Sequence, residues 1–177
     1  MRATIFETEA GWCGFGWTPA GLRKFALPRD AEAAVMEEIG PASWVDAGEA
    51  PPPWDGLIAE AVGYFRGEGP VDFSKYPVDL SGVPPFHKKV YEAMRKIEWG
   101  SVVTYGELAA ASGNRAAARA AGQACARNPV ALVIPCHRVV GVSGLTGFGG
   151  GLDLKRRMLQ IEGYREFSCG RGAGAGV

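Results

Sequence analysis

The stretch VALVIPCHRVVG, residues 130–141, decides how the fold of the second half of this 177-residue chain is interpreted. It is a β-branched apolar run, typical of buried extended chain, and it contains Cys136 followed directly by His137. A nearby imidazole is the commonest means of ionising a thiol to its nucleophilic thiolate. Because adjacent residues of extended chain point to opposite faces, we expect His137 to reach Cys136 through a water molecule. From these residues alone, an inert core thiol and a nucleophile both remain open.

Two short helices are predicted upstream of this stretch. TYGELAAASGN (104–114) begins with Thr104 and Glu107 at capping-box spacing, in which each side chain satisfies a backbone donor at the helix start. RAAARAAGQACAR (115–127) follows after a glycine-containing turn, and such a pair is typical of a helix-turn-helix. The second helix is mostly Ala and Gly around one long cation, Arg119. It is therefore either a tightly packed core helix or a smooth surface that can enter a nucleic-acid groove.

Further elements are predicted on both sides of this region. Residues 85–99 carry apolar side chains at helical spacing, with basic residues on the outer face. The Gly-rich loop at 144–151 is not a phosphate-binding P-loop, because no Gly-Lys-Ser/Thr follows it; it suits a close approach of backbone instead. A helix is predicted at 152–164, and we expect residues 168–177 to form a disordered tail.

The first half has the pattern of a small α/β domain. The predicted elements are strands at 2–8 and 12–27, the second interrupted by a turn at Thr18–Gly21, and helices at 29–39 and 54–66. Strands that alternate with helices predict an α/β domain over residues 1–80. A linker is expected at 81–85, and a mainly helical domain at 86–167.

The net charge is zero, but the charges are unevenly distributed. Residues 1–85 contain 6 Lys and Arg against 13 Asp and Glu, a net −7, whereas residues 86–177 contain 13 against 6, a net +7. The basic half is a candidate for contact with phosphate, although a solvated surface would explain the same charges.

The cysteines indicate a reducing compartment and no metal site. Their spacing forms no CxxC pair and the chain has only two histidines, so neither a disulfide framework nor zinc ligands are predicted; the four are Cys13, Cys125, Cys136 and Cys169. No apolar run approaches the ~20 residues of a membrane span, and no secretory signal is recognised. We expect a cytoplasmic protein, or a nuclear one in a eukaryote, without membrane contact.

Several motifs together resemble one family, the O6-alkylguanine-DNA alkyltransferases, or methylated-DNA–protein-cysteine methyltransferases. The matching motifs, within residues 85–163, are SVVTYGELA (101–109), NRAAARAAGQACARNP (114–129), PCHRV (135–139) and GGLDLKRRMLQIEG (150–163). Residues 1–80 resemble the family's first domain only in size and rhythm. The resemblance implies a ribonuclease H-like α/β N-terminal domain and a winged-helix-like C-terminal domain with the helix-turn-helix.

The resemblance also implies a reaction and its residues. Cys136 is expected to accept the alkyl group of O6-alkylguanine, with O4-alkylthymine left open as a second substrate. His137, acting through a water, and Glu162, bonded to His137, are expected to ionise the thiol. Tyr105 is expected to stabilise or protonate the departing guanine. Because the product is a thioether, the protein is consumed after one event and needs no cofactor.

Base flipping from double-stranded DNA is implied as well, with a monomer bound in the minor groove. Arg119 is expected to replace the flipped nucleotide. The other expected DNA contacts are Thr104, Ala118, Ala120 and Gly122. The residues expected to shape the pocket are Asn128, Val139, Phe148 and Gly149.

Three alternatives remain at this stage. A non-catalytic lesion-binding relative would resemble the same family but lack the acceptor cysteine. A cysteine hydrolase using Cys136 and His137 would turn over on an ester or amide. A transcription regulator built on the helix pair would bind a specific operator sequence.

Overall fold

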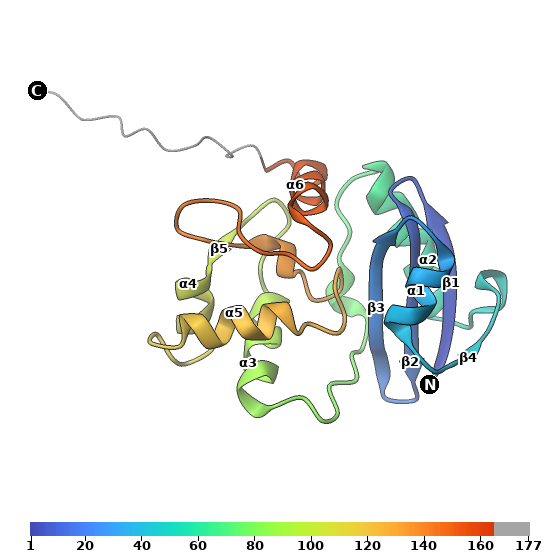
Figure 1. Cartoon of the computed structure of the whole chain (residues 1–177), viewed down its shortest axis with the longest axis horizontal. Coiled ribbons are helices and arrows are strands. Elements are labelled where there is room, and N and C mark those ends of the chain that lie inside the picture. Colours follow the sequence, from blue (N-terminus) through green and yellow to red (C-terminus); the bar gives the residue numbers. More distant parts are fainter. Residues whose placement is uncertain (165–177) are drawn as a thin grey trace, which may run out of the picture.

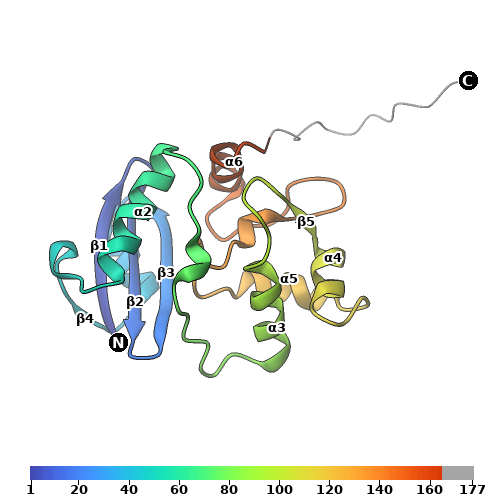
Figure 2. The ribbon, with the colours of Figure 1, turned by 180° about the vertical axis from the view of Figure 1, so that it is seen from behind.

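The computed structural model describes residues 1–164, which form two halves lying side by side (Figures 1 and 2). One half is a four-stranded sheet with a helix on each face, and the other is built mainly of helices. This confirms the predicted α/β half followed by a mainly helical half. The tail predicted at 168–177 lies outside the described residues. None of the helices formed by residues 1–164 has the length and apolarity that crossing a membrane requires.

Three antiparallel strands form a meander at the start of the chain. They are β1 (Arg2–Thr8), β2 (Gly11–Thr18) and β3 (Gly21–Arg29), and β4 (Ser43–Trp44) pairs with β1 in parallel, which gives the order β3-β2-β1-β4. Gly21 has a φ of 137°, and a Cβ there would lie 2.7 Å from the carbonyl oxygen of Pro77. This turn therefore requires glycine, and the predicted break between the second and third strands is confirmed.

The two helices of this half cover opposite faces of the sheet (Figures 1 and 2). Helix α1 (Glu32–Ile39) closes a small cluster of Ala3, Ala26, Val35 and Ile39. Helix α2 (Trp54–Arg66) covers the other face, where aromatic rings dominate; they include Phe6, Phe15, Trp17, Phe25 and Trp54. Helix α2 matches its predicted bounds. Helix α1 starts later than the predicted residue 29, because Arg29 still pairs with Trp12 in the sheet.

The second half surrounds a short parallel strand pair with helices. Its elements are α3 (Pro85–Met94), β5 (Val103–Thr104), α4 (Tyr105–Ala111), α5 (Ala118–Ala126), the 3₁₀ turn η3 (Cys136–Arg138), β6 (Val139–Val140) and α6 (Leu152–Ile161). Two further 3₁₀ turns complete the described chain. η1 (Ala47–Glu49) lies between β4 and α2 in the first half, and η2 (Phe73–Lys75) lies in the connection between α2 and α3. Helices α4 and α5 pack together as the predicted helix-turn-helix. The capping box is confirmed: Thr104 Oγ1 accepts from Glu107 N at 3.2 Å, and the Glu107 carboxylate accepts from Thr104 N at 2.7 Å.

The chain before Cys136 is buried, as predicted, but the prediction that it is extended was wrong. Asn128 Oδ1 accepts from Val130 N at 3.1 Å, and its Nδ2 donates to Ile134 O at 2.7 Å. Ile134 N also donates to Val130 O at 2.9 Å. The Asn128 amide thus supplies partners that a β ladder would otherwise supply. The chain turns between Val130 and Ile134, and Cys136 then lies in the 3₁₀ turn η3 rather than in a strand.

Three helices of this half are shorter than predicted. Helix α5 begins at Ala118 instead of residue 115, because Asn114 closes a turn first. The Asn114 carbonyl oxygen accepts from Ala117 N, and its side-chain Oδ1 accepts from Ala116 N. Helices α3 and α6 end at Met94 and Ile161, short of the predicted residues 99 and 164, in tight turns.

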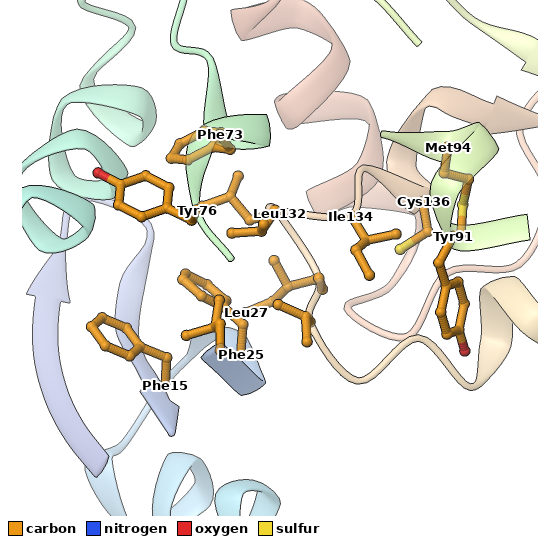
Figure 3. Packing of buried hydrophobic residues seen from close by; sticks show 14 of the residues in the cluster. Phe15, Phe25, Leu27, Phe73, Tyr76, Tyr91, Met94, Leu132, Ile134 and Cys136 are labelled. Carbon is orange, nitrogen blue, oxygen red and sulfur yellow. The ribbon is translucent and has the colours of Figure 1, made fainter. Parts of the chain in front are cut away.

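One apolar core connects the two halves (Figure 3). It runs from the sheet, through the chain around η2 and the turns before η3, to α3; the labelled members are Phe15, Phe25, Leu27, Phe73, Tyr76, Leu132, Ile134, Cys136, Met94 and Tyr91. Phe25 N donates to Pro129 O at 2.9 Å, so β3 also holds the second half through its backbone. Cys136 therefore lies at the far end of a core that begins in the sheet.

Candidate active site

Cys136 is the first residue of η3 and lies directly after Pro135. It is 8% exposed, and in Figure 3 it lies beside Met94 and Tyr91 of α3. A thiol with so little accessible area cannot react with large molecules in free solution. It suits a group that is brought into a pocket.

Two opposed influences act on this thiol. Burial is the larger and raises the pKa of Cys136 above its ordinary value. The Asn128 side chain, the Lys155 ammonium, and the backbone N–H groups of Cys136 and His137 lower it. Burial thus opposes formation of the thiolate, and a base that accepts the thiol proton would favour it.

His137 has the geometry of that base. It is 1% exposed, and its Nε2 lies 2.7 Å from Oε1 of Glu162. Its Nδ1 is buried and has no hydrogen-bond partner among residues 1–164. Burial lowers the pKa of His137, although Glu162 opposes this. A neutral imidazole that donates from Nε2 carries its lone pair on Nδ1, so Nδ1 is the atom that can accept a proton.

Glu162, at the C-terminal end of α6, is the most heavily bonded group of the site. Arg138 donates from Nε to Oε2 at 2.8 Å and from Nη2 to Oε1 at 3.0 Å. Gly100 N donates to Oε2 at 3.4 Å, and the Tyr64 hydroxyl donates to Oε1 at 3.0 Å. Burial acts to raise the pKa of Glu162, but His137 and Arg138 outweigh it and hold the pKa at about 2. The carboxylate stays charged and fixes the orientation of the imidazole.

Tyr64 brings the sheet half into this site. It lies in α2 and is fully buried. Besides the bond to Glu162, its hydroxyl donates to Met158 O at 3.3 Å. Its ring meets Trp99 edge-on at 5.6 Å and lies 6.4 Å from the His137 ring. Both members of the His137–Glu162 pair therefore contact the N-terminal half.

Tyr105 lies between the helix pair and the Gly-rich loop. It is the first residue of α4, and Thr146 Oγ1 donates to its hydroxyl at 3.4 Å. A Cβ on Gly122 of α5 would lie 3.7 Å from its ring, so the ring packs against that glycine. Burial raises the pKa of Tyr105; the Thr146 hydroxyl opposes this effect, and Cys125 and Cys136 add to it. Tyr105 is therefore a protonated phenol near the thiol, and it can donate a hydrogen bond.

The residues predicted to contact DNA lie together on the helix-turn-helix. Arg119, in the first turn of α5, is exposed and forms no ion pair with any of residues 1–164. Ala118, Ala120 and Gly122 of the same helix are half-buried, as is Thr104 at the start of α4. The structure thus groups them on two packed helices, and their contact with DNA stays a prediction.

The residues predicted to shape the pocket have different surroundings. Asn128 closes the turn before η3, and its side chain lowers the pKa of the Cys136 thiol. Val139 is buried in β6, and its carbonyl oxygen accepts from Lys155 Nζ at 2.6 Å. The half-buried ring of Phe148 lies 5.9 Å from the same Nζ. Gly149 is exposed, and a Cβ there would meet nothing within 4 Å, so the structure does not pack this residue against the site.

Sequence reasoning assigned no role to three residues that the structure places here: Tyr64, Arg138 and Lys155. Lys155 is fully buried and shares the inner face of α6 with Met158, Leu159 and Glu162. A signal was present, because two charged residues occur at the helical spacing of a buried face. Arg138 stands in the PCHRV motif, while the contact of Tyr64 depends on how the two halves pack, which no local pattern predicts.

These features define a class of protein. A buried cysteine, a histidine–carboxylate pair and a helix-turn-helix together make a thiol nucleophile on a scaffold of the kind that binds DNA. No group of three or more His, Cys, Asp and Glu side chains within residues 1–164 is placed to hold a metal ion.

Comparisons with known proteins identify the family. The model of the 6-O-methylguanine DNA methyltransferase DNA-binding domain matches residues 85–164. The methylated-DNA–protein-cysteine methyltransferase of Methanosarcina acetivorans is 40% identical over 165 residues, which cover 92% of this chain and 99% of the relative. That of Metallosphaera sedula is 44% identical over 108 residues, or 61% of this chain and 67% of the relative.

Solved structures agree with this assignment. The crystal structure of Mycobacterium tuberculosis OGT in complex with DNA has a TM-score of 0.74 at 30% identity and covers 92% of both chains. The O6-methylguanine-DNA methyltransferase of Pyrococcus kodakaraensis has a TM-score of 0.70 at 27% identity, over 91% of this chain and 99% of that one. The chain belongs to the methylated-DNA–protein-cysteine methyltransferase family, which confirms the resemblance found in the sequence.

Proposed function

We propose that this chain repairs O6-alkylguanine in double-stranded DNA by moving the alkyl group onto Cys136. As a member of its family, the chain repairs alkylated DNA by transfer to one of its own cysteines. One observation carries the choice of Cys136: it directly precedes the buried His137, whose Nε2 is fixed by Glu162. Cys13 lies in the sheet instead, between Trp12 and Gly14, neither of which is a base.

The first chemical step is ionisation of the thiol. The S–H proton passes to Nδ1 of His137 through one water, and the electron pair stays on sulfur. Glu162 stabilises the imidazolium that forms, because it is already charged and bonded to Nε2. Arg138 keeps that carboxylate ionised, and its two bonds prevent the side chain from turning away.

The second step is a displacement at saturated carbon. The thiolate forms the new S–C bond while the bond from carbon to O6 breaks, and the electrons of that bond pass to the guanine. Tyr105 donates a hydrogen bond or a proton to the leaving base; its raised pKa keeps the phenol protonated and favours the hydrogen bond. The product is a thioether that no ordinary redox step reverses. Each chain therefore acts once.

The target carbon lies inside the duplex, so the nucleotide must be rotated out at a cost of a few kcal/mol. We infer that α5 enters the minor groove, which is only ~6 Å wide and admits small side chains such as those of Ala118, Ala120 and Gly122. Thr104 borders the same surface, and Arg119 fills the gap left in the stack. Recognition then depends on phosphate charge and on the lesion, with little sequence preference.

The finer organisation belongs to the same proposal. A monomer with a ribonuclease H-like domain (residues 1–80), a linker (81–85) and a winged-helix-like domain (86–167) would carry the site. Val139, Phe148 and Gly149 would line the pocket, with Gly149 contributing through its backbone.

One experiment tests the proposal. The protein is incubated with a duplex that contains O6-methylguanine, digested, and analysed by mass spectrometry; we expect one added methyl per chain on the Cys136 peptide, and none on the Cys13 or Cys125 peptides. Binding without methylation would instead indicate a lesion-binding protein, and repeated turnover on an ester would indicate a hydrolase. A parallel duplex with O4-methylthymine measures substrate breadth.

A further inference from the structure

Lys155 is a fully buried cation without a carboxylate partner in the part of the chain that the structure describes. Its Nζ donates to Val139 O at 2.6 Å and to Thr146 O at 3.0 Å, and neither acceptor carries a formal charge. Buried charges are normally paired, because an isolated ion costs several kcal/mol of desolvation. The neighbouring buried cation follows that rule, since Arg138 is paired with Glu162.

Lys155 interacts electrostatically with two thiols and also with the His137 imidazole, whose pKa it lowers. Burial lowers the pKa of Lys155, and only Cys136 and then Cys125 are found to oppose this among residues 1–164. In return, Lys155 lowers the pKa of both cysteines. The backbone explains this proximity: α6 packs against η3, and the carbonyl oxygen that holds Nζ belongs to Val139, three residues after Cys136.

Of these two thiols, Cys136 is the better partner for a cation. The Cys125 thiol lies 3.7 Å from Met94 Sδ, and burial raises its pKa, as it raises that of Cys136. Cys136 has additional groups that stabilise its ionised form, namely the Asn128 side chain and two backbone N–H groups. It also has His137 beside it as a base.

We propose that Lys155 is a positioning residue whose ammonium is the counter-ion of the Cys136 thiolate. The inference rests on the proposed function, in which Cys136 is the acceptor. His137 takes the proton, and Lys155 stabilises the negative charge that remains on sulfur. The two carbonyl oxygens fix the ammonium, and one of them, that of Thr146, belongs to the Gly-rich loop. Ionisation of the Cys136 thiol therefore depends in part on the contact between Thr146 of this loop and Lys155.

The first test compares Lys155→Met and Lys155→Arg with Arg157→Met, which removes an exposed cation from the same helix. Alkylation of the Cys136 peptide is followed by mass spectrometry against pH, with neutral iodoacetamide and anionic iodoacetate. We expect Lys155→Met to raise the apparent pKa of Cys136 by about one unit or more, a tenfold or larger loss of rate near neutrality. We also expect it to lower the rate ratio of iodoacetate to iodoacetamide, and Lys155→Arg to restore most of both.

The variants leave the other ionisable groups around Cys136 in place; they are His137, Cys125, Tyr91 and Tyr105. If Lys155 only holds the fold together, Lys155→Met will lower the melting temperature and change both reagents alike, with no change in the pKa or the reagent ratio. That result would overturn the inference.

A second measurement uses the unaltered protein, in case Lys155→Met does not fold. The pKa of the Lys155 ammonium is measured by ¹⁵N NMR before and after Cys136 is capped with iodoacetamide. We expect capping to lower this pKa, because the thiolate is the anion that raises it; an unchanged value would contradict the inference. The proposed function fails separately, if the methylated duplex leaves Cys136 unmodified.

Discussion

Each half of this protein buries a cysteine, and different polar groups surround the two thiols. Cys13 lies in the sheet, where burial raises its pKa to about 12 although Thr8 and Arg29 oppose this effect. Cys136 is nearly as buried, but Asn128, Lys155 and two backbone N–H groups oppose the effect of burial. Burial disfavours both thiolates, and only Cys136 has a histidine next to it in the sequence that can accept its proton. The sheet half supplies apolar packing and the helical half supplies buried charge.

The division between a supporting sheet half and a reacting helical half is not complete, because Tyr64 of the sheet half contacts the site in the helical half. Its hydroxyl donates to Glu162 from the sheet half, at 3.0 Å. The helical half thus contains the reacting groups, while one contact from the sheet half helps to hold the carboxylate that orients the base.

The largest effect is expected when the buried cysteine of each half is replaced by alanine in two separate variants. Cys136→Ala should abolish alkyl transfer from an O6-methylguanine duplex and leave duplex binding close to that of the unaltered protein, because only the nucleophile is removed. Cys13→Ala should retain transfer and lose about 1 kcal/mol of stability, typical of a small core change. Methyl incorporation and gel-shift binding measure the two effects. Transfer by Cys136→Ala would refute the assignment.

Glu162→Gln is expected to have the next largest effect. The neutral amide cannot stabilise an imidazolium on His137, so transfer should slow by about a hundredfold, and the apparent pKa of Cys136 in iodoacetamide reactions should rise. Arg138 also loses its counter-ion, which should cost about 3–5 kcal/mol of stability at neutral pH. Glu98→Gln, at an exposed glutamate, is the control. An unchanged thiol titration would remove Glu162 from the ionisation step.

The stability difference between Glu162→Gln and the unaltered protein should itself depend on pH. The folded-state pKa of Glu162, about 2, lies below its ordinary value of 4.5. This carboxylate therefore contributes stability that is complete above about pH 5 and is lost as the pH falls from 4.5 towards 2. Urea unfolding should show the two proteins converging over this range. A constant difference would mean that Glu162 is not ionised in the folded state.

Arg119→Ala should have a smaller effect that depends on the substrate. If Arg119 fills the gap left by a flipped nucleotide, its loss should slow repair of a duplex by about tenfold to a hundredfold, the equivalent of ~1.4–2.7 kcal/mol. Reaction with free O6-benzylguanine should be unchanged, because no flipping is needed. Arg127→Ala, at the other end of α5, is the matched control. Equal losses on both substrates would contradict the finger role.

The sequence was sufficient to predict local structure where the pattern was local. The capping box at Thr104, the helix-turn-helix and the strand break before Gly21 all follow from neighbouring residues, and each was found. The stretch before Cys136 was predicted incorrectly, because its β-branched residues favour a strand while one amide, Asn128, provides competing backbone partners. Propensity cannot anticipate which side chain will close a turn.

The candidate site was predictable in part, for a similar reason. Cys136, His137 and Glu162 belong to motifs that the family resemblance covers, and the structure brings His137 and Glu162 together. Lys155 was overlooked, since a lysine in a helix is normally solvated, although its spacing from Met158, Leu159 and Glu162 places it on the buried face of α6. Tyr64 required knowledge of how α2 meets α6, almost a hundred residues later in the chain.

The smallest effect is expected from Tyr64→Phe, which removes only the oxygen that connects the sheet half to the site. A hydrogen bond to a charged group is worth about 1.5–3 kcal/mol, but Glu162 keeps its bonds from Arg138 and His137. We therefore expect a stability loss near the lower end of that range, a pKa of Glu162 above its present value of about 2, and slower ionisation of Cys136 by only about threefold.

The same half offers a matched control for that change. Tyr76→Phe also removes a phenol that donates to a carboxylate, that of Glu60 at 2.9 Å, but far from the thiol. It should lower stability without changing the pH profile of Cys136 alkylation. If Tyr64→Phe behaved in the same way, the contact would serve folding alone, and the division between a supporting half and a reacting half would be complete. A shifted profile for Tyr64→Phe alone would show that the sheet half takes part in preparing the nucleophile.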